Sequence, residues 1–298
     1  MSNINRKLNI NTLLKSAKYK AKAILPKQVL RLVQRYLYWR KFRLKEELKN
    51  LELKEKHSGS RAFIIGNGPS ILKQDLTLLS NEITFVLNSF FHHDQYEQIN
   101  PTYLCSCDPS LNDAVHRKAW YELQKEKTKQ TIKLFSKQAE IVDLECNLFQ
   151  DHLVYYIHTP AYFVPPLYSL EHCPTDLTKP LASHGLVFID IAMLAACYMG
   201  IKEIYLLGMD GGEIKSLDDY INYNFYGADP LFSLEQYEDS YETFFVDKQF
   251  QSSREGLYEK SIACISKTFE KNNIKIFNAT LQGFEMGFKR IKFEDIFK

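Results

Sequence analysis

A glycine-rich turn, Gly66-Asn67-Gly68-Pro69-Ser70, follows a short apolar run and precedes a helical pattern. Glycines let the backbone approach a ligand closely, and a proline at a helix start presets the backbone there. Free N–H groups at such a start attract phosphate. The turn therefore predicts a nucleotide site. A purely structural strand-to-helix connection is the alternative, because the lysine of a Walker A motif and the third glycine of a dinucleotide fingerprint are both missing.

Polar side chains also end other apolar runs that read as strands. Asn88 and Asp108 are expected at the carboxyl ends of parallel strands, the edge at which open α/β sheets hold ligands. Capping of the following helix is the alternative for both residues. Asp210 ends the run 203–210, whose apolar residues on both faces predict a central parallel strand.

A histidine stands at the start of a strongly apolar helical pattern. Ser183-His184-Gly185 precedes this pattern, which covers residues 186–198. The positive end of a helix dipole disfavours imidazolium, so His184 would stay neutral, as a general base must be. A histidine that caps the helix or packs as a polar side chain is the alternative.

Residues 211–250 are aromatic, with acidic residues between the rings. A loop of this length is either disordered or functional, and the aromatic content argues against disorder. We expect a lid that stacks on a sugar or a base. A small helical insertion packed on the core is the alternative.

The elements that must position these residues follow one another at the intervals of an α/β fold. We predict a single Rossmann-like parallel sheet sandwiched by helices, preceded by an N-terminal helical arm. The predicted strands are 61–65, 83–88, 103–108, 132–135, 153–157, 203–210 and 274–280.

The arm carries the positive charge of the chain. Residues 1–56 hold 16 Lys and Arg against four Glu and no Asp, while the whole chain has a net charge of only +2. Leu30, Val33 and Leu37 form an apolar stripe beside aromatic and arginine residues. Such a helix suits an anionic membrane surface, here through residues 13–45.

Other uses of the arm remain open: docking on the acidic remainder of the chain, or packing in a homo-oligomer. No recognition helix or RNA-binding motif indicates nucleic acid. We predict an arm over 1–58 and a catalytic domain over 59–298. No apolar stretch of about 18 residues predicts a membrane span, and no secretory signal is visible. The predicted location is the cytoplasm, peripheral on the inner face of the cytoplasmic membrane.

The six cysteines are scattered, without the paired spacing of a zinc site, and a reducing setting is the simpler expectation. We therefore predict no resident metal.

The order of motifs resembles two related bacterial families. The quoted segments are F-I-I-G-N-G-P-S, V-L-N, D-P-S, S-H-G, A-C-Y-M-G-I-K-E-I-Y-L-L-G-M-D and I-K-I-F-N-A-T, between residue 61 and about residue 296. One family is the single-domain sialyltransferases, and the resemblance to it implies a GT-A-like variant of the Rossmann fold. The other is the MptE-like family of surface-polysaccharide loci, which includes flagellin nonulosonate transferases and is closer in the tail N-A-T-L-Q-G-F-E.

The resemblance implies roles for individual residues. CMP binding falls on Gly66, Asn67, Gly68, Pro69, Ser70 and Asn88. Asp108 and Ser110 correspond to the positions beside the donor phosphate and sugar. The family's T-S-G segment corresponds to Ser183 and Gly185, and His184 departs from it. The tyrosines that hold the leaving phosphate would be Tyr220, Tyr223 or Tyr226.

The family's catalytic histidine precedes the last long helix, and no histidine stands between His184 and the C terminus. Either His184, Asp210 or Asp108 is therefore expected as the base, or the chemistry differs from that of the family.

These residues predict a glycosyltransferase. It would pass a nonulosonic acid or Kdo-type sugar from a CMP-activated donor to a glycan or glycolipid acceptor of the lipopolysaccharide or capsule, with no cofactor required. A role for Mg²⁺ stays open, because a single Asp can bind it together with substrate phosphates. The alternatives are an MptE-like diphosphokinase that uses ATP and Mg²⁺ through Asp108 and Asp210, and a non-catalytic polysaccharide-assembly scaffold.

Overall fold

The computed structural model describes most of the predicted catalytic domain. The described residues are 47–106, 114–137, 140, 149, 153–159, 172–181, 186–247, 256–283 and 286–298. Residues 13–45 of the predicted arm lie outside this set, as do Asp108, Ser110 and Ser183-His184-Gly185.

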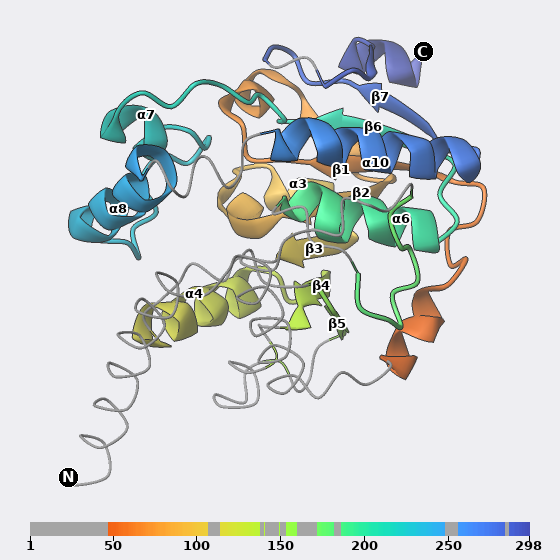
Figure 1. Cartoon of the computed structure of the whole chain (residues 1–298), viewed down its shortest axis with the longest axis horizontal. Helices are drawn as coiled ribbons and strands as arrows, with labels where there is room; N and C mark the ends of the chain where they lie inside the picture. Colours follow the sequence, from red (N-terminus) through yellow and green to blue (C-terminus); the bar gives the residue numbers. More distant parts are fainter. Residues whose placement is uncertain are drawn as a thin grey trace, which may run out of the picture.

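A parallel sheet organises the described residues, which confirms the predicted fold class (Figure 1). Its strand order is β5-β4-β3-β2-β1-β6-β7-β8, and every neighbouring pair is parallel. The strands are β1 Arg61–Ile65, β2 Ile83–Leu87, β3 Tyr103–Ser106, β4 Ile132–Ser136, β5 Val154–Ile157, β6 Glu203–Leu207, β7 Lys275–Asn278 and β8 Lys289–Arg290.

β1 lies at the point where the strand order reverses. Ala62 pairs with Ile83 of β2 on one side and with Ile204 of β6 on the other. The chain therefore builds the sheet outward from β1 in one direction and later returns to its opposite side. In open α/β sheets the crevice beyond the carboxyl ends of such strands is where ligands bind.

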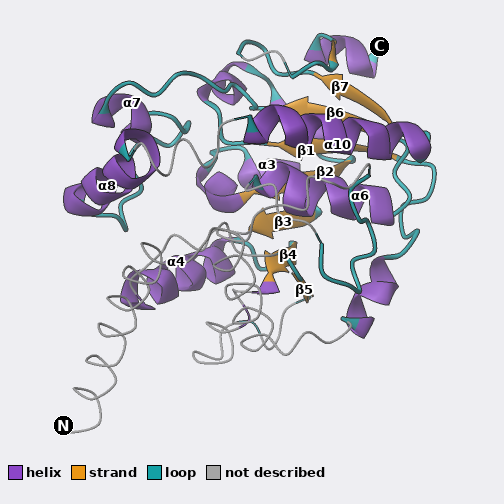
Figure 2. Ribbon diagram, viewed as in Figure 1, coloured by secondary structure: helices purple, strands orange, loops and turns teal. Residues whose placement is uncertain are grey.

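Both faces of the sheet are covered, as the apolar strands require. Ala62 and Ile64 point into one core, and Phe63 and Ile65 into the other, because side chains alternate along a strand. Helices supply the two layers (Figure 2). The first core is closed by η5 Phe188–Met193, α6 Leu194–Tyr198 and α10 Leu257–Lys271; the second by η2 Pro69–Lys73, η3 Leu76–Leu79, η4 Asn88–His92, α3 Tyr96–Ile99, α4 Ala114–Lys127 and η7 Phe293–Phe297.

The helix predicted after the glycine turn is two short 3-10 helices, η2 and η3. Ile71 and Leu76 are fully buried, whereas Leu72 is exposed. Asp75 begins η3 by accepting a hydrogen bond from the backbone N–H of Thr77 at 3.1 Å. The apolar residues thus fill the core without a continuous α-helix.

Residues 211–247 form a small helical insertion, the alternative to an irregular lid. It contains α7 Leu217–Ile221, α8 Leu234–Tyr241 and η6 Glu242–Val246, and a serine capping box begins each of the two α-helices. α7 and α8 lie beside the sheet rather than on it (Figure 1). Their rings pack on one another, with the Tyr220 and Phe245 centroids 5.3 Å apart.

The segment before β1 contacts the sheet domain. In η1 Leu48–Leu53, Lys49 Nζ donates to the carbonyl of Val154, and Asn50 Nδ2 donates to the carbonyl of Tyr156, both at 2.9 Å. Leu53 is fully buried in the first core. Residues 47–58 thus pack on the sheet domain, and the boundary between 1–58 and 59–298 stays a prediction.

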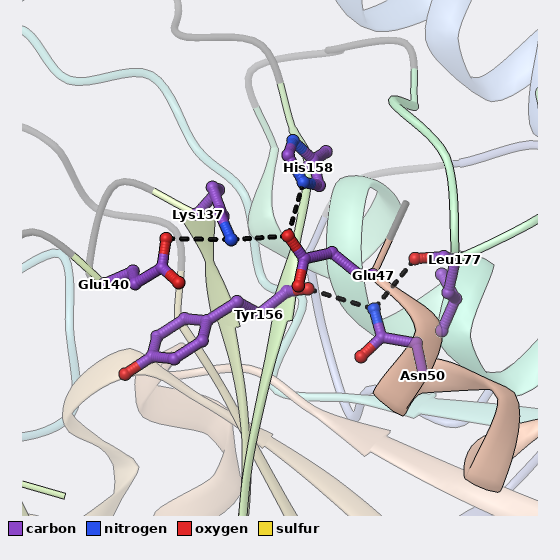
Figure 3. A network of polar contacts seen from close by, with 7 residues as sticks. All are labelled: Glu47, Asn50, Lys137, Glu140, Tyr156, His158 and Leu177. Carbon is purple, nitrogen blue, oxygen red and sulfur yellow. Dashed lines mark hydrogen bonds and ion pairs between the residues drawn. The ribbon is translucent and has the colours of Figure 1, made fainter. Parts of the chain in front are cut away.

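A buried polar network also involves this segment (Figure 3). The Glu47 carboxylate accepts a hydrogen bond from His158 Nε2 at 2.7 Å and forms an ion pair with Lys137, which follows β4. Lys137 also pairs with Glu140 at 2.8 Å.

Of the described helices, none combines the length and hydropathy that a membrane crossing requires.

Candidate functional site

The turn after β1 and the turn after β6 lie in direct contact. Gly68 N donates to the carbonyl of Gly208 at 2.9 Å. A Cβ at Gly66 would lie 2.5 Å from the Gly208 carbonyl oxygen, and a Cβ at Gly68 would lie 1.8 Å from Asp210 Oδ2. The two glycines are therefore needed for the approach of the second turn.

The carboxylate of Asp210 occupies the helix start that the sequence assigned to phosphate. Its Oδ2 accepts hydrogen bonds from Ser70 N at 3.2 Å and Ser70 Oγ at 2.9 Å, and Asp210 is buried. The N–H groups of Gly66 and Gly68 are bonded to backbone carbonyls. The N–H groups of Gly66, Gly68 and Ser70 thus donate hydrogen bonds within the protein. The expectation that free N–H groups of this turn attract phosphate is therefore wrong for these three groups. The nucleotide role of the turn residues stays a prediction, which rests on their side chains and shape.

Two asparagines present acceptors at this edge. Asn67 Nδ2 donates to the carbonyl of Leu87 at 3.1 Å, which fixes the amide and turns Oδ1 the other way. Asn88 follows β2 with a φ of +47°, in the left-handed region that asparagine tolerates better than most residues. Within the described structure, Asn67 Oδ1, Asn88 Oδ1 and Asp210 Oδ1 are buried without a hydrogen-bond partner.

Buried acceptors without partners are costly, so such groups call for an explanation. All three follow strands at the switch point, β1, β2 and β6. A ligand that brings N–H or O–H donors to this edge would satisfy them. Ser106 Oγ, at the end of β3, is a further buried atom without a hydrogen-bond partner in the described structure.

An open pocket of about 390 Å³ adjoins Asp210. The loops after β6 and β7 and the helix α7 form it, with Pro69 of the first turn at its wall. A Cβ at Gly283 would lie 2.0 Å from the Asp210 carbonyl oxygen, so the loop after β7 packs closely on the loop after β6. Its lining includes Pro69, Asp210, Asp219, Tyr223 and Gly283.

Tyr223 is the predicted lid tyrosine that lines this pocket. Tyr223 is 39% exposed, but the desolvation of its hydroxyl, and then the negative charge of Asp210, raise the pKa of this group above its ordinary value. Tyr223 therefore stays protonated at neutral pH and can donate a hydrogen bond.

The other two predicted lid tyrosines lie elsewhere. Tyr220 packs within the helical insertion, and the Tyr226 ring lies 5.5 Å from His92. The insertion contacts the first turn through Phe225, whose N–H donates to the Asn67 carbonyl at 2.7 Å.

Three further residues lie near the site and were not predicted from the sequence. Tyr258 of α10 has its pKa raised to about 12 by burial and then by Tyr223. Gln282 lines the pocket, in a loop without a motif of its own. Asn278 ends β7, and the rule that selected Asn88 would have selected it as well.

The remaining candidates cannot be placed in this geometry. Asp108, Ser110, Ser183, His184 and Gly185 lie outside the described residues. Within the described ranges, no group of three or more His, Cys, Asp or Glu side chains could hold a metal ion.

Comparisons with known proteins give a likeness in structure. No family model matches the sequence, and no curated protein matches it. Among solved structures, the chain is similar to the sialyltransferase CstII from Campylobacter jejuni in complex with the substrate analogue CMP-3FNeuAc. The two are 15% identical, with 78% of this chain and 86% of that chain covered and a TM-score of 0.42.

Proposed function

We propose that the protein is a glycosyltransferase that uses a CMP-activated nonulosonic acid or Kdo-type sugar. The acceptor would be a surface glycan or glycolipid of the lipopolysaccharide or capsule. The observation that carries the proposal is the set of buried acceptors Asn67 Oδ1, Asn88 Oδ1 and Asp210 Oδ1 at the switch point. The order of motifs in the sequence resembles that of sialyltransferases and MptE-like proteins, which supports the same proposal.

Cytidine carries donors that fit this edge. The exocyclic amino group of cytosine and the ribose hydroxyls are N–H and O–H donors, whereas a phosphate offers acceptors. The nucleoside would therefore lie against the asparagines, and the phosphate would extend toward the pocket beside Asp210. The Tyr223 hydroxyl could there donate to the leaving phosphate as its charge develops.

The transfer step needs a base for the acceptor hydroxyl. His184, Asp210 and Asp108 are the proposed candidates. Asp210 is held by Ser70 through one oxygen, which leaves Oδ1 as the atom that could accept a hydrogen bond or a proton. The donor sugar would leave CMP through an oxocarbenium-like transition state, and no metal is required for this step.

Thermal unfolding with added nucleotides tests the proposal. We expect CMP to stabilise the protein with and without Mg²⁺, and more strongly than UDP or ATP, because ligand binding to the native state raises its stability. Stabilisation by ATP only in the presence of Mg²⁺ would favour the diphosphokinase. A lack of response to CMP, CDP, UDP and ATP alike would favour the non-catalytic scaffold.

We also propose that residues 13–45 hold the protein on the inner face of the cytoplasmic membrane. The charge of +12 over residues 1–56 supports this. We expect the full chain to float with vesicles that contain anionic lipid and to be released by high salt, since screening weakens exposed charge pairs. Equal binding to neutral vesicles would contradict an electrostatic contact.

A further inference from the structure

Two cysteines from distant parts of the chain meet on one face of the sheet. Cys173 lies in the segment 172–181, and Cys264 lies in the middle of α10, the helix in front of β1 and β6 in Figure 1. Their sulfur atoms are 2.7 Å apart, although 91 residues separate them in sequence. This proximity is a product of the fold and was not expected from their spacing.

The backbone around the pair is held in place. Cys173 N donates to Thr268 Oγ1 at 2.7 Å, and Thr268 Oγ1 donates to the Cys264 carbonyl at 2.8 Å. The segment at Cys173 is therefore tied to α10 by bonds that do not involve sulfur. A disulfide bond is about 2.05 Å long, so the observed sulfur separation needs only a small side-chain movement to reach it.

We propose that Cys173 and Cys264 form a covalent modification site, at which an intrachain disulfide is made by exchange with a small-molecule disulfide such as glutathione disulfide. This inference does not rest on the proposed enzymatic function. It goes beyond the expectation of a reducing setting for the six cysteines, because it assigns two of them a bond that forms under oxidising conditions.

The exchange proceeds in two steps. Cys264 is partly exposed, whereas Cys173 is 5% exposed, so the Cys264 thiolate attacks the external disulfide first and releases one thiol. The Cys173 thiol then loses its proton to solvent, attacks the Cys264 sulfur of the mixed disulfide and expels the second thiol. Two protein thiols become one disulfide, and one external disulfide becomes two thiols.

The contact with Cys264, and then burial, raise the pKa of Cys173, so this thiol is protonated at neutral pH. Cys264 thus remains the first nucleophile. In a reducing setting the pair stays as two thiols, and a more oxidising glutathione ratio closes the bond.

The closed bond would join α10 to the chain segment before η5. Constraining a loop of this length lowers the entropy of the unfolded chain, and we expect the unfolding midpoint to rise by about 4–8 °C on oxidation.

Peptide mapping of the full chain in glutathione buffers tests the proposal. Cleavage after Glu171 and before Asp176 isolates Cys173 from other cysteines, and trypsin isolates Cys264 between Lys260 and Lys267. We expect these two peptides to be joined after oxidation and separate after reduction. Mass spectrometry of wild-type protein decides this without any substitution.

The variants Cys173→Ser and Cys264→Ser should lose both the joined peptide and the rise in the unfolding midpoint. Cys197→Ser, which changes a buried cysteine of the same core, should keep both. The proposal is overturned if both thiols remain alkylatable after equilibration with glutathione disulfide. It is also overturned if only glutathione adducts form, or if either cysteine links to Cys107 or Cys146.

Discussion

Asn88 has a left-handed backbone conformation, and its side-chain oxygen is a buried acceptor without a hydrogen-bond partner among the described residues. Either feature alone has ordinary explanations, since asparagine tolerates positive φ and often ends a strand. Both features occur together at Asn88, beside Asn67, whose amide nitrogen already donates to the Leu87 carbonyl. This combination supports a site in which a ligand donates hydrogen bonds to both side-chain oxygens.

Asn88→Gly removes the acceptor and keeps a residue suited to positive φ. We expect about 10-fold weaker CMP binding by calorimetry, because one hydrogen bond to a buried group contributes about 1–2 kcal/mol. Asn100→Gly is the matched control, since Asn100 has a φ of +48° at the end of α3. Equal losses of affinity in both variants would indicate a general effect of glycine.

Gly68→Ala tests the contact between the two turns. Gly68 has a φ of −62°, so alanine brings no backbone strain, but its Cβ would meet Asp210 Oδ2. We expect a loss of about 1–3 kcal/mol in unfolding free energy, typical of overpacking, measured by urea denaturation. In Gly68→Ala/Asp210→Ala the combined loss should be smaller than the sum of the two single losses, because the clash with the carboxylate is gone and only the contact with the Gly208 carbonyl oxygen at 2.7 Å remains. Additive losses would mean that Asp210 does not limit the size of residue 68.

At the scale of elements, η1 closes the exposed edge of the sheet. β5 is an edge strand, and unpaired carbonyls of such a strand can pair with another chain. Lys49 and Asn50 donate to two of these carbonyls, and the Glu47 network continues the contact to the ends of β4 and β5. The chain that enters the domain thus also protects its edge.

Glu47→Gln should destabilise the protein by about 1–3 kcal/mol at neutral pH, because Lys137 and His158 lose a charged partner in a largely buried place. Burial raises the pKa of Glu47, but the hydrogen bonds from His158 and Lys137 outweigh it, so the pKa lies below 4.5. Glu47 therefore contributes stability above pH 4.5 that is lost as pH falls through the lowered pKa.

Urea unfolding of wild type and Glu47→Gln from pH 3 to 7 would measure this. The two stabilities should converge at the acid end. Glu140→Gln is the control, because Glu140 contacts Lys137 from a more exposed position, and its effect should be smaller. A difference that stays constant down to pH 3 would contradict the ionic role of Glu47.

The strands were predictable because their apolar runs are buried on both faces, as with Phe63 and Ile64. The helices were less so. Residues 69–79 carry a helical apolar pattern but form two 3-10 helices. Residues 211–250 were expected as a lid, with a small helical insertion as the alternative, and residues 211–247 form the insertion. Asn88 and Asp210 were selected from strand ends, yet the contact of Asp210 with Ser70 could not be foreseen, because 140 residues separate them. The Glu47 network depends on tertiary contacts for the same reason.

Considered as a whole, the molecule buries many tyrosines, which makes its stability sensitive to alkaline pH. Burial raises the pKa of Tyr96 and of Tyr155 to about 12. Because the pKa in the folded state lies above the ordinary value of 10.0, each of these tyrosines contributes to the free energy of unfolding in full below pH 10. This contribution is lost as pH rises toward 12. Burial lowers the pKa of Lys133 from 10.5 to about 8. Between these two pH values the effect of Lys133 raises the free energy of unfolding and so opposes the effect of the tyrosines.

We therefore expect unfolding free energy to fall with pH mainly above about 10.5. Urea denaturation followed by fluorescence between pH 8 and 12 would measure the decline. Tyr96→Phe should lose stability at neutral pH, because it loses the hydrogen bond to Thr131, but its curve should fall less steeply above pH 10.5. Parallel curves for the variant and the wild type would show that Tyr96 does not contribute to the decline.

The place of β1 between β2 and β6 has a consequence for synthesis on the ribosome. β1 ends at residue 65, but its second neighbour begins only at residue 203. During translation of the intervening chain, one side of this central strand has no permanent partner. The turn at Gly66 also lacks Asp210 until that stretch has emerged. Nascent chains that stop before β6 should therefore be aggregation-prone and bind chaperones, whereas chains that extend beyond residue 210 can close the sheet around β1.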